Sequence, residues 1–159
     1  MICRTLKFLL TMTNKTMTTS DEGIALIAQF EGFRKQAYVC AGGKWTIGFG
    51  HTKGVKEGDE ITEAQGLQYL REDVADAENA VRKWVHAPLR QNQFDALVSF
   101  VFNVGAGNFA ASSLLREVNF DADDFADIRP RFLAWVYSNK RKLEGLVRRR
   151  KAEADMYCR

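Results

Sequence analysis

The chain has 159 residues, of which 46% are hydrophobic and 27% charged, a balance that indicates a folded globular protein and excludes a disordered or fibrous one. Its 23 Lys and Arg against 20 Asp and Glu give a net charge of +3, which favours an anionic partner without identifying one. The three cysteines, Cys3, Cys40 and Cys158, cannot all pair within one chain, so we expect free thiols. With only two histidines and no Cys-x-x-Cys motif, we expect neither a metal site nor a cofactor.

The first 18 residues have the pattern of an N-terminal tail. Arg4 and Lys7 precede an apolar run at 8–10, which is shorter than the roughly 7–15 residues of a secretory signal or the roughly 20 of a membrane span. Met12 and Met17 follow closely, as in an upstream extension of a reading frame. We expect residues 1–18 to be a flexible tail and residues 19–159 to form one domain.

The predicted elements begin with a helix. Thr19 and Glu22 have the spacing of a capping box, and apolar residues recur at helical spacing to about Lys35, which places Glu31 near the C-terminal end of the helix. Glycines then recur throughout residues 40–62. We expect a small β-hairpin lobe of two or three short strands in this segment.

The rest of the chain has helical patterns. Thr62 and Gln65 form a second capping box, at the start of an amphipathic helix that runs to about Trp84. Pro130 fits the first turn of another helix, which extends through Tyr137. Further helices are expected at 94–102, 112–118, 123–128 and 146–157. The fold class is therefore α+β, with a β-lobe and a larger helical lobe joined by a long helix and separated by a cleft.

Glu31 is the first candidate for chemistry. Phe30 precedes it and Phe33 follows closely, and a carboxyl held against apolar groups retains its proton more readily, as a general acid must. Taken alone, a helical glutamate is more often a solvated surface group. Cys40 and Thr46 are the next candidates, although Cys40 also fits a small buried residue and Thr46 a β-branched strand former.

The spacing of these three residues resembles the catalytic segment of the phage lysozyme family, glycoside hydrolase family 24. Members carry a Glu, an Asp or Cys after eight residues, and a Thr after five more that begins a Thr-Ile-Gly-x-Gly-His run, which residues 46–51 match. The resemblance continues through residues 93–105 and through a Gly-Leu-x-x-Arg-Arg-x-x-Glu pattern that ends at Glu153. It covers about residues 19–157, and three motifs in one order are far more specific than one.

The resemblance implies a lysozyme-like catalytic domain and an endolysin that hydrolyses the β-1,4 bonds between N-acetylmuramic acid and N-acetylglucosamine in bacterial peptidoglycan. Glu31 would protonate the glycosidic oxygen, while Cys40 and Thr46 would act on a water on the opposite face of the sugar. Many members have Asp at the position of Cys40. Because a thiol is a poor base at neutral pH and a thiolate a strong nucleophile, the sequence leaves open whether Cys40 orients water, deprotonates it or attacks the sugar.

Further residues have expected roles around this set. Gly48 and Phe49 are expected to bind substrate, the glycine by close approach of its backbone to the glycan. Asn103 is expected to bind the glycan, with a helix cap as its alternative role. His51 is expected to be structural and paired with a carboxylate across the lobes. The resemblance further implies that one arginine of the pair Arg148 and Arg149 faces Glu31 and fixes its orientation.

The partner that the resemblance implies is the glycan strand of peptidoglycan, with no nucleic acid and no stable membrane insertion, and we expect a monomer. The protein is expected to stay in the host cytoplasm until lysis and then to reach the periplasm and cell wall through a holin-type hole. The alternatives are a lytic transglycosylase, a chitinase-like enzyme, and a non-catalytic wall-binding or nucleic-acid-binding module. The spacing of Cys40 and Thr46 counts against the transglycosylase, and the complete set with Glu31 counts against a binding module.

Overall fold

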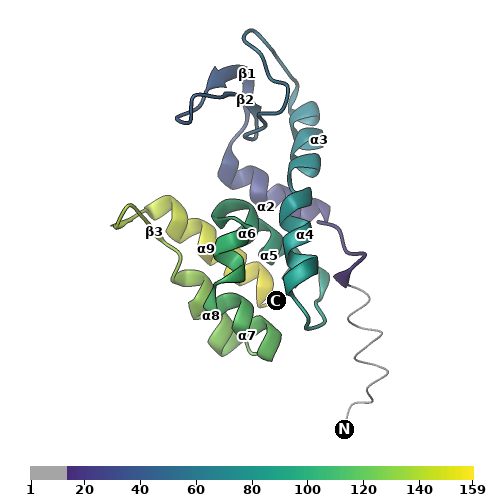
Figure 1. Ribbon diagram of the computed structural model, residues 1–159, viewed down its shortest axis with the longest axis vertical. Coiled ribbons are helices and arrows are strands. Elements are labelled where there is room, and N and C mark those ends of the chain that lie inside the picture. The colour runs from purple at the N-terminus through teal and green to yellow at the C-terminus, as the bar shows by residue number, and fades with distance from the viewer. Residues whose placement is uncertain (1–13) are drawn as a thin grey trace.

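The computed structural model describes residues 14–159, which form a small β-lobe above a larger helical lobe (Figure 1). Helices α2 and α3 lie where the two lobes meet, so the predicted α+β class with two lobes is confirmed. The elements in chain order are α2 (Asp21–Glu31), β1 (Arg34–Val39), β2 (Trp45–Gly48), α3 (Glu63–Asp73), α4 (Ala75–Trp84), α5 (Gln91–Val104), α6 (Ala106–Ala110), α7 (Ser113–Phe120), α8 (Phe125–Leu133), β3 (Tyr137–Ser138), β4 (Arg141–Lys142) and α9 (Glu144–Tyr157).

Helix α2 is shorter than the sequence pattern predicts. Its cap is Ser20, whose hydroxyl accepts a hydrogen bond from the backbone of Gly23, whereas Thr19 donates both its N–H and its hydroxyl to the buried carboxylate of Glu78. The helix ends at Glu31 because Gly32 turns the chain with a φ of 73°, a conformation that favours glycine. The residues expected to continue the helix instead enter β1.

Strands β1 and β2 form an antiparallel hairpin that places the two β-lobe candidates close together. Tyr38 pairs with Thr46, and the N–H of Cys40 donates to the carbonyl oxygen of Lys44 at 2.9 Å, which closes the turn. Isolated bridges link this hairpin to the loop that follows it. The expectation of two or three short strands is therefore met by two strands with added bridges.

The predicted long helix is two helices that meet at Val74. Its start is as expected, because Thr62 and Gln65 form a complete capping box. Val74 has φ −73° and ψ −10°, and it is 1% exposed, so it keeps the chain turning in the helical sense while burying its side chain at the junction. The connection between the lobes therefore contains a break of one residue.

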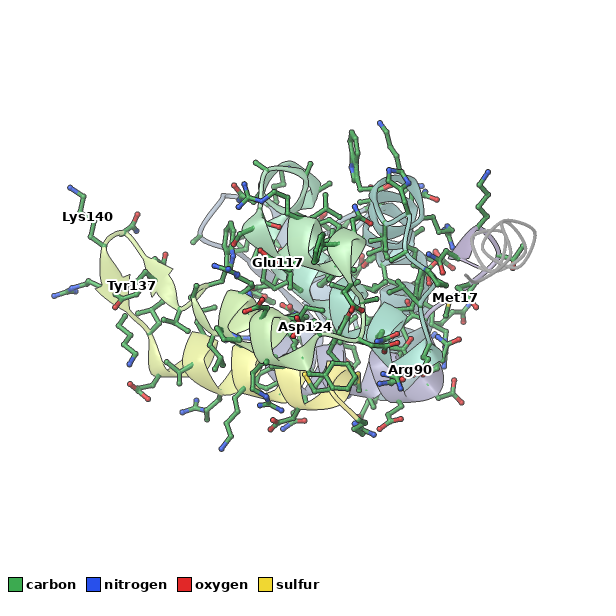
Figure 2. All side chains as sticks on the ribbon, turned by 90° about the horizontal axis from the view of Figure 1, so that it is seen from below. Met17, Arg90, Glu117, Asp124, Tyr137 and Lys140 are labelled. Carbon is green, nitrogen blue, oxygen red and sulfur yellow. The ribbon has the colours of Figure 1, made fainter. Side chains whose placement is uncertain are left out.

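The segment around Pro130 departs from the prediction. Helix α8 begins earlier, with Asp124 as its cap, and Pro130 lies inside it. Tyr137 belongs to the β3–β4 hairpin, which projects from the helical lobe (Figure 2). Asn139 and Lys140 both have positive φ, 49° and 64°, as in a two-residue type I′ turn. The usual second residue of such a turn is glycine, so the sequence carried a weak hairpin signal here.

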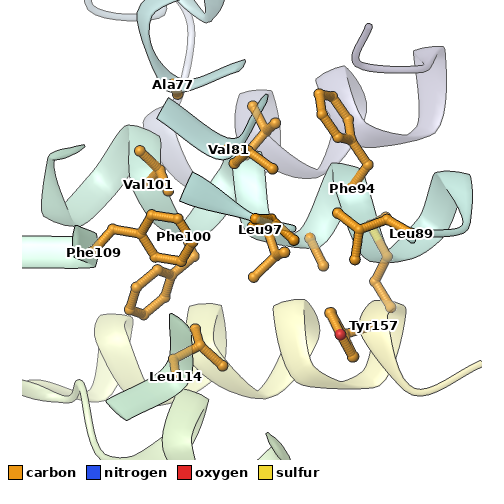
Figure 3. Close-up of a cluster of buried hydrophobic side chains, with 14 of the residues drawn as sticks. Ala77, Val81, Leu89, Phe94, Leu97, Phe100, Val101, Phe109, Leu114 and Tyr157 are labelled. Atoms are coloured by element: carbon orange, nitrogen blue, oxygen red, sulfur yellow. The ribbon is translucent and has the colours of Figure 1, made fainter. Parts of the chain in front are cut away.

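The hydrophobic core is built around α5 (Figure 3). Its residues Phe94, Leu97 and Phe100 are fully buried, because α2, α4 and α9 all pack against this helix. The ring of Phe100 meets that of Phe132 edge-on at 5.5 Å. A helix such as α5, which is apolar around most of its circumference, is expected at the centre of a domain, where other helices pack around it.

The end of the predicted tail is packed against the helical lobe. Asn14 is 1% exposed, its amide nitrogen donates to the carbonyl oxygen of Ala87 at 2.7 Å, and its amide oxygen accepts from the N–H of Leu89. The carbonyl oxygen of Met17 accepts from Arg82. Residues 14–18 are therefore part of the folded domain, and the remainder of the tail prediction lies outside the described residues.

His51, expected to be structural and paired with a carboxylate, attaches the β-lobe to α3. Its Nδ1 lies 2.9 Å from Oδ2 of Asp73, and its Nε2 lies 2.9 Å from the carbonyl oxygen of Lys53. The imidazole also stacks on Tyr69 with the ring centroids 4.5 Å apart. Because both ring nitrogens face acceptors, loss of the carboxylate would leave a buried donor without its partner.

We predict that Asp73→Asn lowers the free energy of unfolding by about 1–3 kcal/mol, the cost of weakening a largely buried charged hydrogen bond. Urea unfolding followed by circular dichroism measures the change. The matched control is Glu72→Gln, which neutralises an exposed carboxylate on the same helix. If the two variants unfold at the same urea concentration, His51 does not attach the β-lobe in the way described.

Candidate active site

A cavity of about 540 Å³ opens beside the C-terminal end of α2. Glu31, the last residue of that helix, lies in its wall with its side chain 26% exposed. The cavity is lined by Gln29, Phe30, Glu31, Asn103, Leu143, Gly145, Leu146, Arg148 and Arg149. The structure thus brings together residues, among them Glu31 and Arg149, that are up to 118 positions apart in the sequence and that the sequence pattern had selected separately.

Arg149 holds the carboxylate of Glu31. Its Nη1 donates to Oε1 of Glu31 at 2.6 Å, while the guanidinium itself is almost fully buried, with 4% of the side chain exposed. Its Nη2 donates to the carbonyl oxygen of Ser99 on α5, and its Nε donates to Oε1 of Glu153. Of the two arginines expected to face Glu31, Arg149 is therefore the one that does so, and Arg148 is exposed on the cavity wall.

Glu153 is the buried carboxylate behind this contact, and it serves two arginines. It is fully buried, it lies 2.7 Å from Nε of Arg150, and it accepts from the hydroxyl of Ser99 at 2.7 Å. Burial raises the pKa of the Glu153 carboxyl and lowers that of the Arg150 guanidinium, and the charge of each opposes the shift of the other. Site reasoning on the sequence missed Arg150 and Ser99, although the i, i+3 and i, i+4 spacing to Glu153 placed both arginines over one carboxylate.

Asn103 is the second cavity residue that this cluster positions. It lies in the last turn of α5, and its amide oxygen accepts from Nη2 of Arg150 at 3.0 Å. Gly105 is the residue that ends the helix, with φ 88°, so Asn103 is not the cap. With its oxygen engaged by Arg150, its amide nitrogen is the atom that can donate to a bound ligand.

Cys40 and Thr46 lie next to each other on the β-lobe, and neither is among the residues that line this cavity. Cys40 is half-buried at the turn, and Thr46 is buried on β2. The pKa of the Cys40 thiol lies below its ordinary value because the Thr46 hydroxyl and then the backbone N–H groups of Lys44 and Gly42 stabilise the thiolate. The same Thr46 hydroxyl lies 3.1 Å from the carbonyl oxygen of Lys44, so it has two acceptors within reach.

Glu31, on the one hand, and Cys40 with Thr46, on the other, are held by different elements of the fold. Among residues 14–159, no hydrogen bond joins Glu31 to Cys40 or Thr46. Glu31 is fixed to the helical lobe through Arg149, whereas Cys40 and Thr46 are fixed within the β-hairpin. The carboxyl group of Glu31 and the thiol of Cys40, whose pKa is lowered, are thus held on two different lobes.

Gly48 and Phe49 are packed inside the protein, and their expected role in substrate binding stays a prediction. Gly48 is buried with φ 63°, and a Cβ there would lie 3.0 Å from Cδ1 of Ile61. Phe49 is 5% exposed, and its ring lies 5.4 Å from that of Phe33. The close approach that requires glycine at position 48 is to the protein itself, since it lets β2 rest against α3.

A two-lobed α+β fold with a carboxyl group in a cleft and a second proton-transfer group on the β-lobe defines a lysozyme-type glycoside hydrolase. The phage lysozyme family matches residues 28–153, and the chain belongs to that family. Within residues 14–159, no group of three or more His, Cys, Asp or Glu is arranged to hold a metal ion. The family assignment and the lysozyme-like fold expected from the sequence are therefore confirmed.

Similar proteins come from phages and from a bacterium. An endolysin of Acyrthosiphon pisum secondary endosymbiont phage 1 is 39% identical, over 89% of this chain and 98% of its own length. The muramidase domain of SpmX from Asticaccaulis excentricus is 39% identical with a TM-score of 0.81, over 88% of this chain and 97% of that domain. A mutant of P22 lysozyme is 35% identical with a TM-score of 0.81, over 89% of this chain and 99% of its own.

We predict that Glu153→Gln lowers the free energy of unfolding by about 3–5 kcal/mol, because it leaves the buried guanidinium of Arg150 without a counter-charge and leaves Arg149 paired with Glu31 alone. Chemical unfolding measures this loss. Glu144→Gln, at an exposed position on the same helix, is the control and should change stability little. Equal stability of the two variants would contradict the role of Glu153 as the counter-charge.

A second prediction concerns the thiol. With Cys3 and Cys158 replaced by Ser, the rate at which iodoacetamide alkylates Cys40 should rise with pH and reach half its maximum below the ordinary pKa of a thiol, because the thiolate is the reactive form. Thr46→Val removes the main stabilising donor, so its midpoint should move to higher pH. If the alkylation rate has the same pH profile with and without Thr46→Val, then Thr46 does not stabilise the thiolate.

Proposed function

We propose that this protein is an endolysin that hydrolyses the β-1,4 bond between N-acetylmuramic acid and N-acetylglucosamine in bacterial peptidoglycan, and so lyses the host cell. The observation that carries the proposal is the contact of 2.6 Å between Arg149 and Glu31 in the wall of the cavity. Related proteins named endolysin and a solved muramidase domain support it.

Glu31 is the general acid in this proposal. Arg149 engages Oε1, so Oε2 is the oxygen that carries the proton and passes it to the glycosidic oxygen as that bond breaks. The guanidinium then stabilises the carboxylate that remains. Asn103, which Arg150 holds through its amide oxygen, hydrogen-bonds the glycan in the same cavity.

Cys40 and Thr46 act on the water. The Thr46 hydroxyl both donates and accepts, which suits it to hold the attacking molecule. The Cys40 thiolate takes a proton from that water as its oxygen bonds to the anomeric carbon on the face opposite the leaving group. The reaction therefore needs the proton on Glu31 and the thiolate form of Cys40, and the lowered pKa of Cys40 favours that thiolate.

The route to the wall is part of the proposal. The enzyme acts as a monomer, without nucleic acid, and passes from the host cytoplasm to the periplasm through a hole that a second phage protein makes in the membrane. Relatives named endolysin support an action on the cell wall, and one that is 33% identical is named a SAR-endolysin. No helix within residues 14–159 has the length and apolar character needed to cross a bilayer.

We predict that Glu31→Gln reduces lysis of permeabilised Gram-negative cells by 10²–10⁴-fold, because the variant keeps the shape of the side chain and lacks its acidic proton. Turbidity measures the rate, and thermal unfolding checks that the variant folds. Glu22→Gln, on the exposed part of the same helix, should lyse cells like the parent protein. Lysis by Glu31→Gln at the parent rate would overturn the assignment.

Mass spectrometry of the released muropeptides tests the reaction itself. Hydrolysis leaves muramic acid with a free reducing end, because a water molecule is added. Products that carry an anhydro ring would instead indicate a transglycosylase and would remove the water-activating role given to Cys40 and Thr46.

A further inference from the structure

The β3–β4 hairpin is an exposed arm at the edge of the helical lobe. Every residue from Tyr137 to Lys142 is exposed, and Tyr137 is 63% exposed. Figure 2 shows Tyr137 and Lys140 pointing away from the body of the molecule, and Figure 1 shows β3 on the outer side of α9. Nothing in the packing of the domain accounts for side chains in this position.

Three consecutive cations form this arm: Lys140, Arg141 and Lys142. Within residues 14–159 none of them belongs to an ion pair, whereas other surface arginines do, such as Arg129, which lies 2.6 Å from Asp155. Residues 137–151 contain seven Lys and Arg and a single acidic residue, Glu144. The hairpin therefore presents positive charge that the protein itself leaves unneutralised.

The tip of the hairpin holds a lysine in a conformation that favours glycine. Lys140 has φ 64°, and the common second residue of a type I′ turn is glycine because it has no Cβ to oppose that angle. Lysine is therefore conformationally disfavoured here, and what it adds to the turn is a long cationic side chain. A disfavoured backbone conformation at an exposed tip indicates that the Lys140 side chain has a functional role.

The base of the β3–β4 hairpin lies next to the cavity that contains Glu31. Leu143 directly follows β4 and lines that cavity, and the exposed Arg148 lies in the same wall. A polymer that crosses the cavity and continues outward on this side must pass the base of the hairpin. The cations are thus placed to contact groups that branch from a chain whose backbone occupies the cleft.

We propose that the β3–β4 hairpin binds the carboxylates on the peptide stems of the peptidoglycan strand while its glycan occupies the cavity. This inference rests on the proposed function. The lactyl carboxyl of each muramic acid is joined to its peptide as an amide, so the free carboxylates of the polymer are on the stems. Stems with several carboxylates match an exposed arm with several cations, and lysine and arginine both donate to carboxylates.

The composition of the arm favours this partner over a lipid surface. Peripheral membrane binding requires an apolar face that enters the interface together with the charges. Tyr137 is the one large apolar side chain within the hairpin, and Leu143 at its base is committed to the cavity wall. A polar, branched polyanion needs no such face.

The experiment measures binding without turnover. In a Glu31→Gln background, which leaves the sacculi undigested, the variant Lys140→Gln/Arg141→Gln/Lys142→Gln is compared with the control Lys56→Gln/Lys83→Gln/Arg116→Gln, which removes three exposed cations elsewhere. Each protein is sedimented at low salt with native sacculi and with sacculi whose carboxyl groups have been converted to amides. We expect the hairpin variant to bind native sacculi about tenfold more weakly than the control, since three exposed ion pairs of modest strength are lost. On amidated sacculi the two should bind alike.

The proposal is overturned if the hairpin variant binds native sacculi as tightly as the control, or if its deficit persists on amidated sacculi. Loss of binding to phosphatidylglycerol vesicles with unchanged binding to sacculi would assign the hairpin to a lipid surface instead. A failure of the proposed function has a different signature, because the protein with Glu31 intact would then release no muropeptides, whatever the sedimentation shows.

Discussion

The buried carboxylate of Glu153 is the interaction on which the active site depends. It lies at the core side of α9 with no exposed surface, and it pairs with both Arg149 and Arg150. A buried charge of this kind is tolerated only when it is paired and hydrogen-bonded, which fixes the positions of both guanidiniums. Arg149 reaches Glu31 and Arg150 reaches Asn103, so one buried group sets the positions of an acid and an amide in the cavity.

The rest of the fold provides the hydrogen-bond partners and the apolar surroundings of the cluster formed by Glu153, Arg149 and Arg150. The central helix α5 offers the hydroxyl and carbonyl of Ser99 to the charged residues from α9, and its apolar surface excludes water around them. The β-lobe is attached independently, by His51 to α3, so Cys40 and Thr46 are carried on a separate support. In the proposed mechanism, these separate attachments keep Glu31 and Cys40 from pairing with each other, so that each can act on a different face of the sugar.

Sequence reasoning succeeded where a local pattern has one physical meaning. The capping box at Thr62 and the spacing of Glu31, Cys40 and Thr46 depend on short-range geometry, and both gave correct expectations of fold class and family. It could not reveal tertiary packing: a Cβ at Gly48 would lie 3.0 Å from Cδ1 of Ile61, a contact that no local pattern shows. The β3–β4 hairpin was not predicted because its turn lacks the usual signal: Lys140 occupies the position where a glycine would have indicated a type I′ turn.

The central claim is that Arg149 positions Glu31 from the buried cluster, and the kinetics of Arg149→Lys test it most directly. Lysine keeps the buried charge, but its single nitrogen cannot reproduce the planar fork that joins Glu31, Glu153 and the Ser99 carbonyl. We predict a folded enzyme whose kcat on peptidoglycan falls by about 10²-fold, as expected for a displaced catalytic group, with KM little changed. A folded Arg149→Lys enzyme with the kcat of the parent protein would contradict the account.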